Sequence, residues 1–116
     1  MRNLLAFDLG ASNGRAILGQ FDGEKITMRE LHRFENNYIE MNGVFYWDLP
    51  YLYNQLKQGF LAFKNANVGE LDCFGIDTWG VDYGLLDKND SRNRASTDWP
   101  RVSRISSQLS CSATCP

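Results

Sequence analysis

The chain has 116 residues, a net charge of −2 and 43% apolar residues, enough for the core of one small domain. Nucleic-acid binding is disfavoured, because neutralising phosphates requires clustered Lys and Arg. A membrane span is also disfavoured, because no apolar run approaches the roughly 20 residues that cross a bilayer. We therefore expect a cytoplasmic chain with neither nucleic-acid nor membrane partners.

Charge is distributed unevenly between two parts of the chain. Residues 1–90 contain 8 Lys and Arg against 13 Asp and Glu, whereas residues 91–116 contain four Arg, one acid and seven Ser. The second part also has too few apolar residues for more than one weak helical face. We expect residues 1–90 to form a partial domain, and residues 91–116 to be a disordered or non-native Ser/Arg-rich tail.

The first part of the chain is predicted to form three strands. Residues 4–7 are a short apolar run typical of a strand buried on both faces, which delivers Asp8 to its C-terminal edge. A glycine-containing bend follows, and residues 15–21 return as a second strand. Asp22-Gly23 is a dipeptide favoured in two-residue type I′ turns, so a third strand should cover residues 24–34.

The third strand is expected at an edge of the sheet. Its apolar alternation is imperfect, because Ile26 and Met28 share a face with Glu30 and His32. His32 is the single histidine of the chain, and we interpret it as a surface or packing residue rather than a catalyst.

A helix is predicted for residues 49–65. Asp48 can accept hydrogen bonds from the free N–H groups of the first turn, where Pro50 is tolerated. Apolar residues recur at spacings of three and four along one stripe: Leu49, Leu52, Tyr53, Leu56, Phe60 and Phe63. A buried parallel strand at residues 71–76 and another strand at residues 81–87 complete the order βββαββ.

Residues 8–15 read Asp-Leu-Gly-Ala-Ser-Asn-Gly-Arg and could hold a phosphate. Small and turn-forming residues let successive backbone N–H groups point into one concavity, which suits phosphate oxygens. A carboxylate beside a phosphate is repulsive unless Mg²⁺ lies between them, so Asp8 would hold the metal through its water shell. The alternative is a glycine-rich hairpin in which Asp8 caps a turn.

Residues 75–84 supply a second polar group around a Thr-Trp-Gly bend. Carboxylates bind sugar hydroxyls and aromatic rings stack on sugar C–H faces, so Asp82 and Trp79 suit a polyhydroxylated ligand. The alternative is structural: Trp79 fills the core, while Asp77 and Asp82 make hydrogen bonds within turns.

Taken together, these two groups resemble the FGGY carbohydrate kinases over residues 3 to about 90, and within that family the rhamnulokinase branch is most similar. The resemblance includes Leu-His-Arg-Phe at residues 31–34, Asn-Gly at 42–43 and Trp-Asp at 47–48. Its most specific motif is Gly-Ile-Asp-Thr-Trp-Gly-Val-Asp at residues 75–82. The match ends after Asp87, close to the change in composition.

The resemblance implies an α/β domain of the RNase H-like, actin-like ATPase type, with a mixed sheet and one main helix. It implies that Asp8 orients Mg²⁺ and that Gly80 lies at the sugar, where Trp79 and Asp82 are further candidate contacts. It also implies that the ATP phosphates contact Ala11, Ser12, Asn13, Gly14 and Arg15. The implied reaction transfers the γ-phosphoryl group of MgATP to the 1-hydroxyl of L-rhamnulose. The implied catalytic base lies beyond residue 116, so we expect no catalytic residue in this chain and no activity from it alone.

Two alternatives remain open at this point. One is another sugar kinase of the same family, such as a xylulokinase or glycerol kinase, and the other is a non-catalytic nucleotide-binding module. Either way, one helix covers one face of the sheet, so we expect the other face to expose residues such as Phe7 or Ile76 and to allow self-association.

Overall fold

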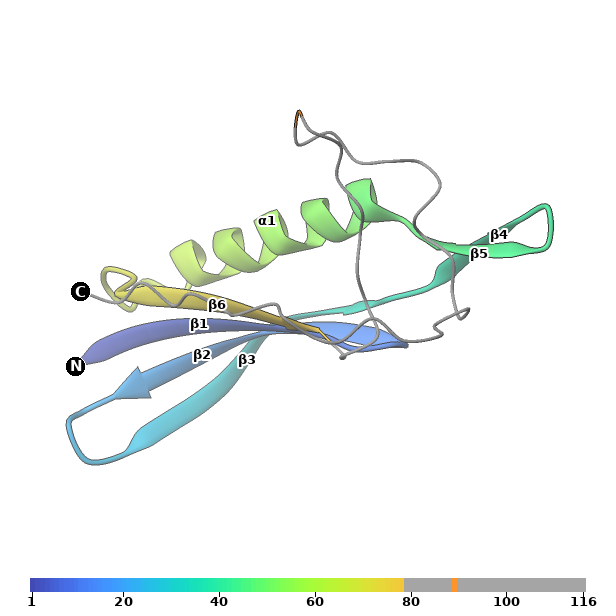
Figure 1. Cartoon of the computed structure of the whole chain (residues 1–116). Coiled ribbons are helices and arrows are strands. Elements are labelled where there is room, and N and C mark those ends of the chain that lie inside the picture. The colour runs from blue at the N-terminus through green and yellow to red at the C-terminus, as the bar shows by residue number, and fades with distance from the viewer. Residues whose placement is uncertain (79–88, 90–116) are drawn as a thin grey trace.

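The computed structural model describes residues 1–78 and 89. Within this part of the chain the elements are β1 (Arg2–Leu9), β2 (Asn13–Phe21), β3 (Ile26–Glu35), β4 (Tyr38–Met41), β5 (Val44–Trp47), α1 (Leu49–Asn65) and β6 (Cys73–Thr78). One mixed sheet has the strand order β3-β2-β1-β6, and β4 and β5 form a separate hairpin (Figure 1). The predicted order therefore agrees, with a hairpin added before the helix; the strand predicted at residues 81–87 lies outside the described residues.

Strand β1 is central in the sheet and has one neighbour of each orientation. It runs antiparallel to β2 and parallel to β6, so that Leu5 pairs with both Leu18 and Phe74. Parallel neighbours need a crossover connection, which α1 provides between β3 and β6. The carboxyl ends of β1 and β6 consequently meet at one edge of the sheet, beside the bend at residues 10–13.

Helix α1 has the bounds that the sequence predicts. Asp48 Oδ1 accepts a hydrogen bond from the Tyr51 N–H at 3.0 Å, and Pro50 lies in the first turn. The helix lies along one face of the sheet (Figure 1), and the core between them consists of Leu5, Phe7, Ala16, Leu18 and Phe63. No helix in the described residues is both long and apolar enough to cross a membrane.

Gly59 allows α1 to approach the sheet closely. A Cβ atom at this position would lie 2.3 Å from Phe7 Cε1 and 2.9 Å from Ala16 Cβ. The Phe7 ring also packs on Phe60, with ring centroids 5.1 Å apart. Phe7 is 1% exposed, so the expectation that it lies on an uncovered face is wrong. The reason is the alternation along β1, which turns Phe7 toward the helix and Asp8 away from it.

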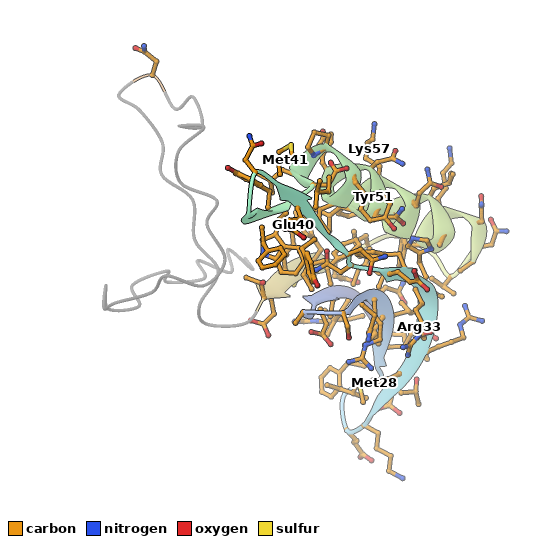
Figure 2. The ribbon with its side chains drawn as sticks, turned by 90° about the vertical axis from the view of Figure 1, so that its right-hand side faces the viewer. Met28, Arg33, Glu40, Met41, Tyr51 and Lys57 are labelled. Carbon is orange, nitrogen blue, oxygen red and sulfur yellow. The ribbon has the colours of Figure 1, made fainter. Side chains whose placement is uncertain are left out.

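The face of the sheet opposite α1 carries a set of apolar side chains. We call this the open face; the strand registers place on it Leu4, Ala6, Ile17, Phe21, Ile26 and Met28. Ile26 and Met28 are 57% and 77% exposed. Figure 2 shows Met28 on the side of the sheet away from α1. One face of the sheet is thus covered by α1, and the other is not covered by any described helix.

A β-bulge in β3 separates two side chains that were predicted to share a face. Leu31 is the extra residue, and it packs against the core. Beyond it His32 turns toward α1, where its Nε2 lies 2.7 Å from Gln55 Oε1, while Glu30 remains on the opposite face. The prediction that His32 shares a face with Glu30 is therefore wrong, whereas the edge position of β3 is confirmed.

The type I′ turn occurs at a different dipeptide from the one predicted. Asn42 and Gly43 have φ angles of 54° and 76° and join β4 to β5. Between β2 and β3 the loop covers residues 22–25, and of these Gly23 alone has a positive φ, at 110°. Asp22 Oδ1 accepts two backbone N–H groups, each at 2.8 Å, and so closes a longer loop than a two-residue turn.

Asn3 ties β1 to the connection that precedes β6. Its side chain is buried, and Nδ2 donates to the carbonyl oxygens of Val68 at 3.1 Å and Glu70 at 2.9 Å. Its backbone N–H donates to Asp72 Oδ2 at 2.7 Å. These bonds satisfy a buried amide and hold the parallel strand beside β1.

Candidate functional site

Asp8 lies near the carboxyl end of β1, between a cation and a second carboxylate. In the strand registers it pairs with Arg15 on β2 and with Asp77 on β6, so the three residues share the side of the sheet away from α1. Arg15 Nη2 lies 2.5 Å from Asp8 Oδ2, and the two side chains are 38% and 43% exposed. Asp8 is therefore a half-exposed carboxylate with a cation on one side and an anionic neighbour on the other.

The bend between β1 and β2 is a tight, polar turn at the same edge of the sheet. The Gly10 N–H donates to the Asn13 carbonyl at 2.9 Å, which closes the turn. Ala11 and Ser12 at its tip are exposed, and Asn13 Nδ2 donates to Ser12 Oγ at 3.3 Å. The predicted phosphate-binding residues thus combine an accessible backbone with side-chain polar groups.

Gly14, another residue of the predicted phosphate site, is buried beneath an aromatic ring. A Cβ atom at Gly14 would lie 2.1 Å from Phe34 Cζ. The Phe34 ring is held in turn by Tyr51, in an edge-on contact with centroids 6.2 Å apart. Gly14 therefore contributes close packing behind the bend, a role that spacing in the sequence does not reveal.

Asn36 contacts the bend directly and was not singled out from the sequence. It follows β3 and is 4% exposed. Its backbone N–H donates to the Ser12 carbonyl at 3.0 Å, and its Nδ2 donates to the Gly10 carbonyl at 2.7 Å. An Asn-Asn pair after a strand normally indicates an exposed turn. The pairing of β3 with β2 is what buries Asn36, and that pairing is visible only in the fold.

A second ion pair lies on the edge strand β3, next to Arg15 of β2. Arg33 pairs in register with Arg15 and donates two hydrogen bonds to Glu30, at 2.9 and 2.7 Å. These bonds lower the pKa of the Glu30 carboxyl and raise the pKa of Arg33, and both side chains remain in solvent. Arg33 is thus largely neutralised by its own partner, which leaves Arg15 as the cation facing Asp8.

The donor groups at this edge suit a magnesium ion that is shared with phosphates. Residues 1–78 and 89 contain no group of three or more acidic, His or Cys side chains that could enclose a metal by themselves. Mg²⁺ commonly takes one or two carboxylates and fills its remaining positions with water and phosphate oxygens. Asp8, with Asp77 in register beside it, provides that smaller number of carboxylates.

The predicted sugar-binding residues Trp79, Gly80 and Asp82 lie outside the described residues. The described chain reaches Thr78, whose Oγ1 donates to the Leu9 carbonyl at 3.2 Å. Thr78, which directly precedes Trp79, therefore lies next to Leu9, the last residue of β1 before the bend. Residues 91–116, predicted to be a separate tail, also lie outside the described part of the chain.

Comparison of sequences relates the chain to rhamnulokinases. The chain is similar to the rhamnulokinase of Mannheimia succiniciproducens, with 47% identity over 89 residues, which are 75% of this chain and 18% of that protein. It is also similar to the rhamnulokinase of Halalkalibacterium halodurans, with 47% identity over 90 residues, 78% of this chain and 19% of that protein. The chain thus spans less than a fifth of the length of these curated relatives. No family model matches it.

Comparison of folds relates the chain to two solved sugar kinases from Lactobacillus acidophilus. A ligand-bound xylulose kinase and a gluconate kinase each align with a TM-score of 0.64 at 10% identity, over 84% of this chain and 19% of theirs. At this identity the likeness concerns the fold alone. It confirms the predicted α/β class, with the actin-like ATPase fold of FGGY sugar kinases.

Proposed function

Because the chain belongs to the rhamnulokinases, a group of FGGY carbohydrate kinases, we propose that it is part of an enzyme that phosphorylates L-rhamnulose at the 1-hydroxyl with MgATP. The observation that carries this proposal is the 47% identity to two rhamnulokinases over 89 and 90 residues. The bend at one edge of the sheet supports this proposal, because it places backbone N–H groups near the half-exposed carboxylate of Asp8.

The bend is the proposed binding element for the ATP phosphates. It comprises Ala11, Ser12, Asn13, Gly14 and Arg15. The exposed tip can offer N–H groups to phosphate oxygens, and the Arg15 guanidinium adds a positive charge beside them. Gly14 contributes through its packing beneath Phe34, which keeps the backbone behind the tip in one conformation.

Asp8 is the proposed residue that holds Mg²⁺ through its water shell, with Asp77 as its neighbour. When bound, Mg²⁺ supplies neutralisation of the charge on the transferred phosphoryl group. Arg15 now neutralises the same carboxylate at 2.5 Å. Arg15 would therefore have to share Asp8 with a bound Mg²⁺, and its guanidinium would then be available to pair with a phosphate oxygen.

Trp79, Gly80 and Asp82 are the proposed contacts to the sugar. Their support is the motif at residues 75–82 and the position of Thr78 beside Leu9. We propose no catalytic base among these 116 residues, so the chain alone is expected to produce no L-rhamnulose 1-phosphate. Phosphoryl transfer needs in-line positioning and a base for the attacking hydroxyl, and the nucleotide has only part of its site here.

A chimera tests the proposal. Residues 1–90 of this chain would replace the matching segment of the Mannheimia succiniciproducens rhamnulokinase, with which it shares 47% identity over 89 residues. We expect the chimera to phosphorylate L-rhamnulose in preference to xylulose and glycerol. Asp8→Asn in the chimera should lower kcat by about 100-fold or more, because it removes a charge that positions the metal.

The matched control is Asp22→Asn, which alters an exposed acid at the far hairpin. Its kcat should equal that of the parent chimera. A chimera that prefers xylulose or glycerol would favour another sugar kinase of the family. Equal kcat values for Asp8→Asn and Asp22→Asn would contradict the role of Asp8.

A further inference from the structure

Asn36 supports the bend from the side of β3 through two hydrogen bonds. Its Nδ2 donates to the Gly10 carbonyl at 2.7 Å and its backbone N–H donates to the Ser12 carbonyl at 3.0 Å. The residue is 4% exposed, so water has little access to compete for these donors. Two alternate carbonyls of the bend are therefore directed toward one buried residue.

The directions of two N–H groups follow from the directions of these carbonyls. A trans peptide is planar, so the N–H of each residue points opposite to the carbonyl of the residue before it. With the Gly10 and Ser12 carbonyls directed at Asn36, the N–H groups of Ala11 and Asn13 must point away from it. Ala11 lies at the exposed tip, where a phosphate oxygen could reach it.

The backbone on either side of Asn36 is itself held by α1 and by the core. The Tyr51 hydroxyl, on the helix residue labelled in Figure 2, donates to the Glu35 carbonyl at 2.9 Å. Phe34 is 7% exposed and lies against Gly14. Asn36 therefore contacts the bend from a fixed position, because the two residues before it are anchored independently.

We propose that Asn36 is a positioning residue for phosphate binding, which fixes the peptide planes of the bend so that the Ala11 and Asn13 N–H groups face the phosphate. This inference rests on the proposed function of the bend. Asn36 does not touch the nucleotide; it acts through the Gly10 and Ser12 carbonyls. Losing its Nδ2 frees the Gly10–Ala11 peptide plane to rotate, which lowers affinity for phosphate without removing any group that contacts it.

Residual dipolar couplings of the ¹⁵N-labelled 116-residue chain test this geometry directly, because they report the orientation of each N–H vector. In Asn36→Ala, the couplings of Ala11 and Asn13 should change while those of β1 and α1 are kept. The matched control is Asn3→Ala, which removes another buried amide that donates to backbone carbonyls, far from the bend. It should lower stability yet leave the bend couplings unchanged.

In the chimera, the KM for MgATP should rise about tenfold in Asn36→Ala, with kcat kept, and should stay constant in Asn3→Ala. If Asn36→Ala unfolds the chain, Asn36→Leu keeps the branched shape of the side chain and removes its Nδ2 donor without adding a charge. Unchanged couplings and an unchanged KM in the Asn36 variant would overturn this inference alone. Couplings that change in Asn36→Ala, together with chimera kinetics for MgATP that neither Asn36→Ala nor Asp8→Asn alters, would instead overturn the proposed phosphate site.

Discussion

At the scale of single residues, the bend depends on groups behind it as much as on those at its tip. Asp8 and the residues after it could be predicted as a candidate phosphate site, because their types and order carry a chemical meaning. Asn36 and Phe34 could not, since they reach the bend through the pairing of β3 with β2. A residue whose role depends on long-range strand pairing leaves no local pattern in the sequence.

Gly14→Ala is expected to destabilise the protein by about 1–3 kcal/mol, the usual cost of overpacking a core. The added Cβ would lie 2.1 Å from Phe34 Cζ, and that ring is confined by Tyr51. Gly75→Ala is the matched control, because it is also a strand glycine and a Cβ there meets nothing within 4 Å. Urea unfolding should show a lower midpoint for Gly14→Ala alone; equal midpoints would mean that Phe34 moves aside without cost.

At the scale of elements, local signals predicted α1 well and the hairpins less well. The bounds of α1 follow from Asp48 and the apolar stripe, which act within the helix itself. The β4–β5 hairpin was not predicted as a pair of strands, although Asn42-Gly43 is the strongest short hairpin signal in the chain. Its strands are four residues each, too short for a clear alternation. The bulge at Leu31 likewise depends on the partner strand.

Gly59→Ala separates helix propensity from packing. Ala is favoured over Gly in a helix interior by about 1 kcal/mol, whereas a Cβ 2.3 Å from Phe7 Cε1 costs about 1–3 kcal/mol or forces α1 away from the sheet. We expect packing to outweigh propensity and the midpoint of thermal unfolding to fall. Gln58→Ala, at an exposed neighbouring position, should leave the midpoint unchanged or raise it slightly. A Gly59→Ala chain more stable than Gln58→Ala would show that the helix and sheet separate freely.

At the scale of the whole molecule, the sheet has one face covered by α1 and one open face. The mixed sheet with one main helix could be predicted from the order of apolar segments and from family resemblance. The exposed residues could not be assigned correctly, because the pairing register decides which face of the sheet each side chain occupies. Both Phe7 and Ile76 were expected on the open face. Phe7 is buried, and Ile76, although 43% exposed, pairs in register with Phe7 and therefore lies on the same side of the sheet as α1.

The open face is expected to cause concentration-dependent association, because exposed apolar side chains are stabilised by leaving water. Met28→Lys adds a charge to a side chain that is 77% exposed, and should shift sedimentation toward the monomer. Tyr53→Lys is the matched control, since Tyr53 is a 65% exposed apolar residue on α1. If both substitutions, or neither, reduce association in sedimentation-velocity experiments, the open face is not the contact surface.

The parallel neighbour of β1 also affects how fast the chain can fold. The β1–β2 and β2–β3 hairpins join segments close in sequence, and such units form in microseconds. Docking β6 brings together Asn3 and Asp72, which are 69 residues apart, and must overcome the entropy of closing that loop. Until α1 has formed and folded back, β1 keeps one edge unpaired. We therefore expect the docking of β6 to be the slow step of folding, and the step that first brings Asp77 beside Asp8.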